Sequence, residues 1–262
     1  MDKDVIVDRR GDVSVIMISR ETKRNALKRS TMQELRRLFS EQERDGAVAI
    51  VLTGGTKIFS AGVDLSELGK GVEDVAVDDE IMETAETIRR LRIPVIAAIE
   101  GPCFGAAVEI AMACDLRVTA KGAYFSIPAT RLGLLYRPGA VAKLVSTLGE
   151  STVTRLLIFN ERISAEEALA LGIATHLVEP GVALETAFAL AGELSSSTAD
   201  AVSATKQLIN ELSDHQENYL HWDEVRRSLL MSEARSRALS NARTRLGHES
   251  SSVGIDDVGE IQ

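Results

Sequence analysis

Two segments of the sequence each combine a short apolar run with glycine and alanine residues, followed by a helical pattern. They are TGGTKIFSAGVDLSEL, residues 53–68, and IEGPCFGAAVEIAMACDLRV, residues 99–118. Small residues at a strand-to-helix junction let the backbone approach a ligand closely, and the first N–H groups of a helix have no partner within it. Two junctions that face each other would supply one N–H each to a single oxygen and stabilise charge developing on a carbonyl. The alternative is that the small residues only allow tight packing of helix on sheet.

A second chemical feature is a stretch without carboxylates. From Leu116 to Gly149 there is no Asp or Glu, although the chain contains 39 of them. The basic residues of this stretch are Arg117, Lys121, Arg131, Arg137 and Lys143. Its centre, FSIPATRLGLLYRPG at residues 125–139, adds Tyr136. Acid–base chemistry by a carboxylate must therefore come from elsewhere in the chain.

Several other kinds of site are not indicated. The GGTK and GPCFGAA sequences lack the spacing of phosphate-binding loops, and there is no G-x-S-x-G motif. The four histidines lie outside both junctions, and there is no C-x-x-C metal pattern, so no metal ligands are predicted. The net charge of −9 argues against general nucleic-acid binding. Two cysteines, a charged N-terminus and no apolar run of about 20 residues predict a reduced, soluble, cytoplasmic protein without a membrane span.

The elements that must position these junctions alternate between strand and helix. Residues 5–19 predict two strands around a turn, 47–55 and 94–101 predict buried strands, and 115–120 and 123–127 predict two more. Helices are predicted at 30–43, 78–92, 105–114 and 164–172, with capping boxes at Thr31–Glu34 and Ser164–Glu167. The acidic segment 66–80 is predicted to be a mobile surface segment. From about residue 181 the chain is predicted to be almost wholly helical, and an α/β class follows.

Four segments, in order, resemble the crotonase (enoyl-CoA hydratase/isomerase) superfamily. IFSAGVDLSEL and EGPCFGAAVEIAMACDLRV are similar to its two central motifs, AFxAGADLxEL and NGxAxGGGxELALACDxRxA. SRETKRNAL is similar to its N-terminal R-P-x-x-x-N-A-L element, with Glu21 at the usual proline, and RISAEEALALGIATHLVEP is similar to a later element. The resemblance covers about residues 5–245. It implies a crotonase fold of repeated ββα units over residues 1–195, a helical trimerisation region over 196–247 and a flexible tail over 248–262.

The resemblance also implies an acyl-CoA substrate, with coenzyme A as part of the substrate and no permanently bound cofactor. The backbone N–H groups of Ala61 and Ala106 would form the oxyanion hole. The adenine and phosphates of coenzyme A would lie near TKRNALKR, where the basic residues are Lys23, Arg24, Lys28 and Arg29. A solvated surface turn is the alternative reading of that cluster. The remaining predicted contacts with the coenzyme are Ala26, Leu27, Ser60, Gly62, Asp64, Leu65 and Gly105. Asp64 is interpreted mainly as a helix cap.

Glu109 is the predicted proton-transfer group. It follows Ala106 by three residues, so the two share one face of a helix. The alternative is a buried glutamate that is held by hydrogen bonds. Two-acid hydratases carry a second glutamate where this chain has Ala129, and hydration uses both a base and an acid. Glu67 or Glu73 of the acidic segment are candidate replacements.

The segment RLGLLYRPG is similar to the methylmalonyl-CoA decarboxylase branch, which lacks the second glutamate and has an active-site tyrosine at the position of Tyr136. That branch often has AGHD where this chain has AGVD, so Val63 departs from it. Arg131 and Arg137 are candidates for holding a substrate carboxylate, although a solvent-facing or inter-subunit role is favoured. The prediction is an acyl-CoA enzyme assembled as a homotrimer or a dimer of trimers. Decarboxylation, hydrolysis or silent acyl-CoA binding are its alternatives.

Overall fold

A computed structural model describes residues 3–69, 74–214 and 218–252. The chain forms two compact units, Met1–Leu194 and Ser195–Gln262. The first unit contains both junctions and every predicted active-site residue. The second is built from helices.

The first unit is organised around a six-stranded sheet in the order β1-β2-β3-β4-β6-β9. The strands are β1 (Val5–Arg10), β2 (Val13–Ile18), β3 (Ala49–Thr53), β4 (Val95–Ile99), β6 (Leu116–Ala120) and β9 (His176–Val178). β1 and β2 pair antiparallel around a turn at Gly11, whose φ of 63° favours glycine, and the other neighbours pair in parallel. The parallel strands β3 and β4 are buried throughout, as their continuous apolar sequences predict.

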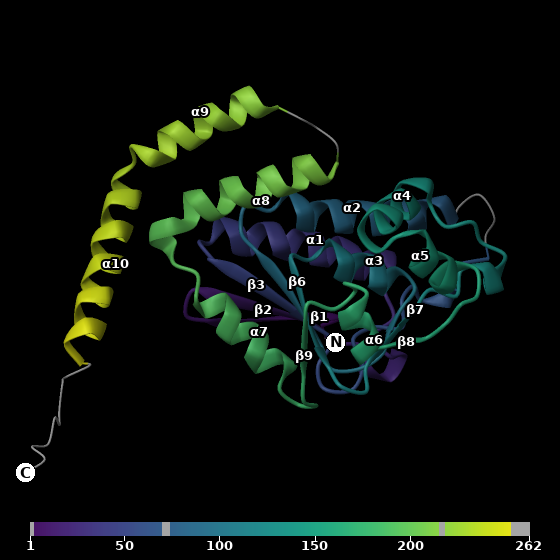
Figure 1. Ribbon diagram of the computed structural model, residues 1–262. Helices are drawn as coiled ribbons and strands as arrows, with labels where there is room; N and C mark the ends of the chain where they lie inside the picture. Colours follow the sequence, from purple (N-terminus) through teal and green to yellow (C-terminus); the bar gives the residue numbers. More distant parts are fainter. Residues whose placement is uncertain (1–2, 70–73, 215–217, 253–262) are drawn as a thin grey trace, which may run out of the picture. The chain divides into compact units, whose positions relative to one another are not determined.

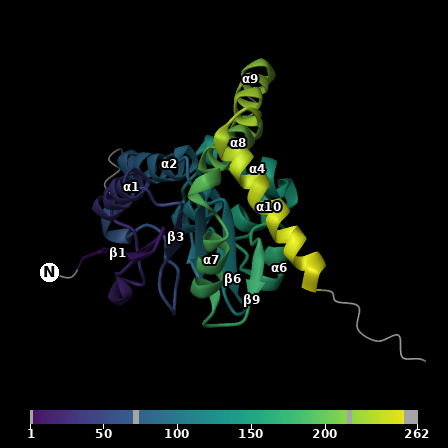
Figure 2. The same ribbon diagram turned by 90° about the vertical axis from the view of Figure 1, so that its left-hand side faces the viewer.

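Helices cover both faces of this sheet (Figures 1 and 2). Because side chains alternate along a strand, Ile50 and Leu52 of β3 pack on one face, and Ala49 and Val51 pack on the other. The first face is covered by α1 (Arg29–Arg44), α2 (Val75–Arg90) and α3 (Ala106–Ala113). The second is covered by α7 (Ala183–Gly192), whose buried alanines allow it to lie close to the strands.

A smaller sheet supports the second junction. It contains β5 (Cys103–Phe104), β7 (Tyr124–Ser126) and β8 (Ile163–Ser164), in that order. Between β7 and β8 lie α4 (Pro138–Leu148) and α5 (Glu150–Leu157), and β8 leads into α6 (Ala165–Ala170). The Ser164 hydroxyl accepts a hydrogen bond from the Glu167 N–H at 3.2 Å, so the predicted cap of α6 is confirmed.

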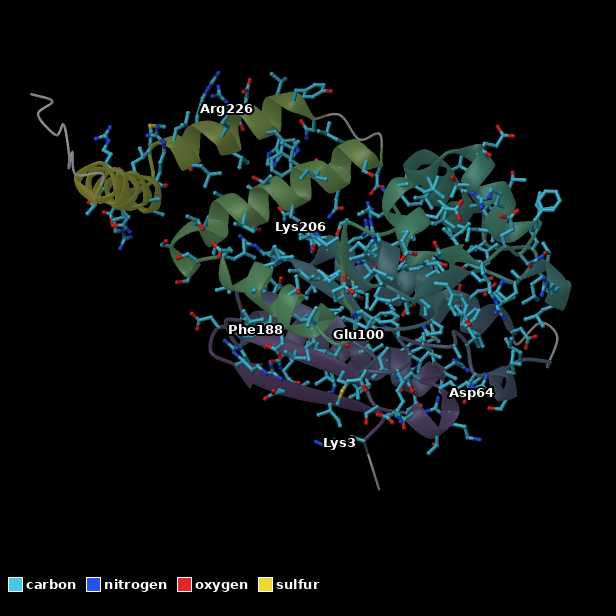
Figure 3. All side chains as sticks on the ribbon, turned by 60° about the horizontal axis from the view of Figure 1, so that its bottom comes forward. Lys3, Asp64, Glu100, Phe188, Lys206 and Arg226 are labelled. Atoms are coloured by element: carbon cyan, nitrogen blue, oxygen red, sulfur yellow. The ribbon has the colours of Figure 1, made fainter. Side chains whose placement is uncertain are left out.

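The second unit consists of α8 (Ala199–Ser213), α9 (Tyr219–Leu230) and α10 (Glu233–Ser252). Lys206 on α8 and Arg226 on α9 are labelled in Figure 3. Side chains of this unit line a largely apolar groove of about 580 Å³, in which Trp222 donates a hydrogen bond to Glu211 at 2.7 Å. None of the helices in the described ranges is long and apolar enough to cross a membrane.

Three predicted boundaries differ from the structure. Thr31 lies inside α1 and donates a hydrogen bond to Asp4, so it is not the predicted cap, because α1 already begins at Arg29. α2 begins at Val75, so much of the segment predicted as a mobile surface is helical. α10 continues to Ser252 and therefore includes the first residues of the predicted tail. Residues 253–262 lie outside the described part.

Candidate active site

The first junction is held by a tight turn at residues 24 and 25. Arg24 and Asn25 both have φ values near +54°, which is uncommon for residues with a side chain. The buried Asn25 side chain stabilises this turn by accepting a hydrogen bond from Arg20 N–H at 2.9 Å and donating to Gly54 O at 2.7 Å. Ser60 donates its hydroxyl to Asn25 O at 2.7 Å. The turn and the first junction are therefore one hydrogen-bonded assembly.

Hydrogen bonds between this turn and the first junction determine which N–H groups of the junction are already used as donors. Ala61 N–H donates to Arg24 O at 3.0 Å, so it is already engaged and does not fit the predicted oxyanion-hole role. Leu27 N–H donates to Gly62 O and Asp64 N–H donates to Leu27 O, which is the pattern of a parallel bridge between Leu27 and Val63. In such a bridge the N–H of Val63 points away from the paired segment. Among the described residues, no hydrogen bond from Val63 N–H is formed.

The second junction presents the start of α3. Ala106 is the first residue of this helix and is preceded by Gly105 with φ 54°. Its N–H therefore has no acceptor within the helix. A Cβ placed on Gly62 would lie 3.4 Å from Ala106 N, so the two junctions are in contact. The N–H groups of Val63 and Ala106 thus come from two neighbouring backbone segments.

Glu109 lies one turn into α3, on a mostly buried face. Its side chain is 12% exposed, and Oε1 accepts a hydrogen bond from Arg137 Nη2 at 2.5 Å. Burial raises the pKa of Glu109 above its ordinary value, while the guanidinium of Arg137 opposes this shift. Arg137 was expected to face solvent or another subunit. It is instead half-buried and paired with Glu109, the candidate catalytic acid. Because residues 116–149 contain no carboxylate, an acidic partner of Arg137 has to come from another segment of the chain.

Tyr136 lies beside this pair and packs against the main core, to which Ala129 belongs. The Tyr136 hydroxyl is buried and interacts with the Glu109 carboxylate, although the contact does not have the geometry of a well-formed hydrogen bond. Burial raises the pKa of this hydroxyl well above its usual range, and the negative charge of Glu109 adds to the effect. Ala129 is 8% exposed and packs in the main core, directly before a short 3₁₀ turn. Arg131, in the same loop, is exposed.

A further acidic residue of this region was not singled out from the sequence. Asp78 of α2 interacts electrostatically with both Arg137 and Glu109. Asp78 is exposed to solvent, but nearby protein atoms still raise the pKa of its carboxyl by desolvation, and Arg137 opposes that shift. Glu67 lies in the 3₁₀ turn Leu65–Glu67, and Glu73 lies outside the described residues. Asp78 is therefore the acid of the predicted 66–80 segment that the structure relates to Glu109.

A pocket of about 390 Å³ opens beside the first junction. Arg24, Lys57, Ala61, Phe104 and Tyr124 contribute to its lining. The rings of Phe104 and Tyr124 meet edge to face with centroids 5.1 Å apart. The pocket thus offers two exposed cations, Arg24 and Lys57, and one exposed carboxylate, Glu21, beside aromatic surface. Lys57 and both rings were missed because they lie outside the basic cluster of residues 22–29.

The other residues predicted to contact coenzyme A do not line this pocket. Lys23 is exposed near the turn, whereas Arg29 lies 3.8 Å from Glu80 of α2. Lys28 immediately precedes α1 as its N-cap residue. Leu65 is 65% exposed, and Gly105 is partly exposed. Ala26, Leu27, Ser60 and Gly62 are buried.

Asp64, labelled in Figure 3, is held by its neighbours. One carboxylate oxygen accepts from Ser66 N–H at 3.2 Å, which confirms the expected capping role on a 3₁₀ turn. The other lies 3.1 Å from Arg20. Hydrogen bonds from Ser66 and the charge of Arg20 lower the pKa of Asp64. Asp64 is thereby an ionised residue that shapes the first junction.

A family model and two curated proteins show which family this chain is related to. The model of the family described as enoyl-CoA hydratase/isomerase matches residues 8–241. A short-chain-enoyl-CoA hydratase from Clostridium acetobutylicum is 34% identical over 214 residues, which cover 79% of this chain and 81% of that protein. The human mitochondrial Delta(3,5)-Delta(2,4)-dienoyl-CoA isomerase is 32% identical over 216 residues, 76% of this chain and 66% of that protein.

Solved structures show the same relationship. An enoyl-CoA hydratase/isomerase family protein from Hyphomonas neptunium has a TM-score of 0.86 at 29% identity, covering 93% of this chain and 95% of that one. An enoyl-CoA hydratase from Bacillus anthracis has a TM-score of 0.84 at 26% identity, covering 93% and 97%. The expected fold of repeated strand and helix units is therefore confirmed over nearly the whole chain.

Proposed function

Because the chain belongs to the enoyl-CoA hydratase/isomerase family, we propose that it is an acyl-CoA enzyme that stabilises a thioester enolate between Val63 N–H and Ala106 N–H. Val63 replaces Ala61 in this role because the Ala61 N–H donates to Arg24 O. Preorganised backbone donors of this kind act where charge develops in the transition state. The contact between Gly62 and the start of α3 supports the placement of both donors around one oxygen.

Glu109 is proposed as the proton-transfer group, and the reaction that it supports best is migration of a double bond. Its carboxylate removes a proton from one carbon of the acyl chain, and the electrons move onto the thioester oxygen as the enolate forms. The same group returns the proton to another carbon of the chain. One carboxylate is sufficient for this reaction, whereas hydration uses a base for water and an acid for carbon. Ala129, at the position of the second hydratase glutamate, supports isomerisation over hydration.

The observation that carries this proposal is the position of Glu109. It lies on the same helix as the Ala106 N–H, three residues further on, and is largely removed from solvent. A buried carboxylate with a raised pKa is suited to exchange a proton with carbon. The relatives include both a hydratase and an isomerase. The family alone therefore leaves the reaction open, and the side chains favour the isomerase.

Decarboxylation is a second candidate because of the Tyr136 hydroxyl. This hydroxyl is buried beside Glu109 without a well-formed hydrogen bond to it, so it is a donor that a substrate carboxylate can accept from. Such a reaction would release carbon dioxide and leave the electron pair on the same enolate. Val63, in place of the histidine frequent in the decarboxylase branch, opposes it. Loss of activity in Tyr136→Phe with a carboxylated acyl-CoA, but not with a simple enoyl-CoA, would favour decarboxylation.

The test is a direct assay with a 3-enoyl-CoA, crotonyl-CoA and methylmalonyl-CoA. We expect conversion of the 3-enoyl-CoA to its 2-enoyl isomer, and slow hydration of crotonyl-CoA. Glu109→Gln should lower kcat about 10²- to 10⁴-fold without abolishing acyl-CoA binding, because it removes the proton-transfer group but keeps the side-chain size. Glu150→Gln is the matched control and should retain activity, because Glu150 is an exposed glutamate at the start of α5. Hydration at a typical enzyme rate, about 10 s⁻¹ or more, would overturn the preference for isomerisation.

Two further results would change the assignment. Tight acyl-CoA binding with no turnover of any of the three substrates would favour a silent binding protein. Failure to bind acyl-CoA would contradict the proposal as a whole. Acyl-CoA binding by the wild-type protein is measured by calorimetric titration, and turnover is measured by the direct assay.

We also propose that the protein is a homotrimer or a dimer of trimers. The support comes from the second unit, where Leu220 and Met231 are 83% and 81% exposed. Large apolar side chains at such exposure are typical of surfaces that another protein covers. The molar mass in solution, measured by light scattering, tests this assembly.

A further inference from the structure

Arg137 and Glu109 form a close ion pair inside the proposed active site. Arg137 precedes α4 and Glu109 lies in α3, and their side chains are 24% and 12% exposed. The contact of 2.5 Å between Arg137 Nη2 and Glu109 Oε1 is that of a charge-assisted hydrogen bond. A guanidinium remains charged under all ordinary conditions, so the partner of Glu109 does not itself titrate.

We propose that Arg137 is a positioning residue that keeps Glu109 ionised and oriented for proton abstraction. This inference rests on the proposed function, because it assigns Glu109 the role of the base. A carboxylate transferred from water into the protein interior favours its neutral form. The hydrogen bond to Arg137 counteracts that preference and fixes one oxygen of the carboxylate.

Asp78 is a second negatively charged residue that interacts with the Arg137 guanidinium. The charge of Asp78 makes the ionised form of Glu109 less favourable, and Arg137 makes the ionised form of both carboxylates more favourable. The remaining titratable group that interacts with Glu109 is Tyr136, whose raised pKa keeps it neutral near pH 7. Asp79 of α2 and Asp74, which precedes α2, raise the pKa of Asp78. The ionisation of Glu109 is thus set by burial, by Arg137, by the Tyr136 hydroxyl and, to a smaller extent, by Asp78.

This arrangement conserves charge during the proposed reaction. When Glu109 takes a proton from the acyl chain, its negative charge disappears and one negative charge appears on the enolate. Arg137 keeps its positive charge throughout. The site therefore has the same net charge before and after proton transfer.

Removing Arg137 and removing Asp78 should shift the pKa of Glu109 in opposite directions. Arg137→Gln removes the stabilising cation, so the pKa of Glu109 should rise, by about one unit or more. Asp78→Asn removes a repelling charge, so this pKa should fall. A base is active in its ionised form, so the acidic limb of the kcat/KM profile should move to higher pH in the first variant and to lower pH in the second. Arg137→Lys keeps the charge and should stay closer to wild type.

The titration is measured in the free protein by the ¹³C signal of the Glu109 carboxyl carbon, assigned by its absence in Glu109→Gln. Asp79→Asn and Arg90→Gln are matched controls, because Asp79 is exposed beside Asp78 and Arg90 is an exposed arginine paired with Glu86. Asp79→Asn should shift the titration midpoint of this signal less than Asp78→Asn, and Arg90→Gln should shift it less than Arg137→Gln. Thermal unfolding by circular dichroism verifies that each variant is folded.

The outcomes separate this inference from the proposed function. Opposite shifts of the Glu109 signal support it, even if no acyl-CoA is turned over, in which case the proposed function alone fails. Shifts of the same sign in Arg137→Gln and Asp78→Asn, or no shift in either, would overturn it. Displaced pH profiles without displaced carboxyl titrations would also contradict it, because the effect would then arise from another group.

Discussion

Gly62 lies so close to Phe104 that no side chain can be accommodated between them. A Cβ on Gly62 would be 2.6 Å from Phe104 O, and the φ of Gly62 is +81°. The backbone after β3 therefore contacts the backbone before α3 directly. This contact brings Val63 N–H and Ala106 N–H to neighbouring positions, and it explains why the SAGVD segment has glycine at this position.

Gly62→Ala should destabilise the protein and reduce its activity together. The new methyl group must displace the Phe104 carbonyl, which we expect to cost about 1–3 kcal/mol beyond the strain of the positive φ. Gly122→Ala is the matched control because Gly122 has φ +88° but no heavy atom within 4 Å of the added Cβ. It should lose about 1 kcal/mol from backbone strain alone and keep its activity. Equal losses in urea unfolding of the two variants would argue against the close contact.

Ala106→Pro tests the second proposed donor without removing a side-chain function. Proline is well tolerated at the first position of a helix because the N–H there has no helical partner. The variant should therefore fold, but kcat should fall about 10²- to 10³-fold through loss of one oxyanion donor. Ala106→Gly retains the N–H and should remain within a few-fold of wild type. If Ala106→Pro were fully active and folded, this N–H would not stabilise the enolate.

The sequence was sufficient to predict the features that depend on local patterns. The two strand-to-helix junctions, the cap at Ser164 and the position of Glu109 on α3 all follow from residue types at short spacing. Thr31 shows the limit of such patterns, because its spacing to Glu34 is that of a capping box although α1 starts earlier. Which residue begins a helix depends on the chain before it, here the extended backbone at Lys28.

Features that depend on pairing between distant segments were not predictable from these patterns. The choice between Ala61 and Val63 is decided by hydrogen bonds to Arg24 and Leu27, more than thirty positions earlier in the chain. The contact of Arg137 with Glu109 joins residues 28 positions apart and needs the loop before α4 to fold back onto α3. In the first case the predicted donor was Ala61, whose engagement by Arg24 O depends on the fold. In the second case Arg137 was a candidate for binding a carboxylate, but its contact with Glu109 also depends on the fold.

The pocket beside Arg24 and Lys57 should contribute binding of the nucleotide part of coenzyme A rather than catalysis. Both side chains are exposed cations at its lining, suited to phosphate groups. Arg24→Gln and Lys57→Gln should each raise KM for an acyl-CoA about fivefold with little change in kcat, because exposed charge pairs contribute modestly. With the matching acyl-pantetheine thioester, which lacks the phosphates and adenosine, the same substitutions should have no effect. Arg90→Gln, far along α2, is the control for removal of a surface charge. If the two variants impaired acyl-pantetheine as strongly as acyl-CoA, these residues would act on the acyl end or on the fold, and the nucleotide would bind elsewhere.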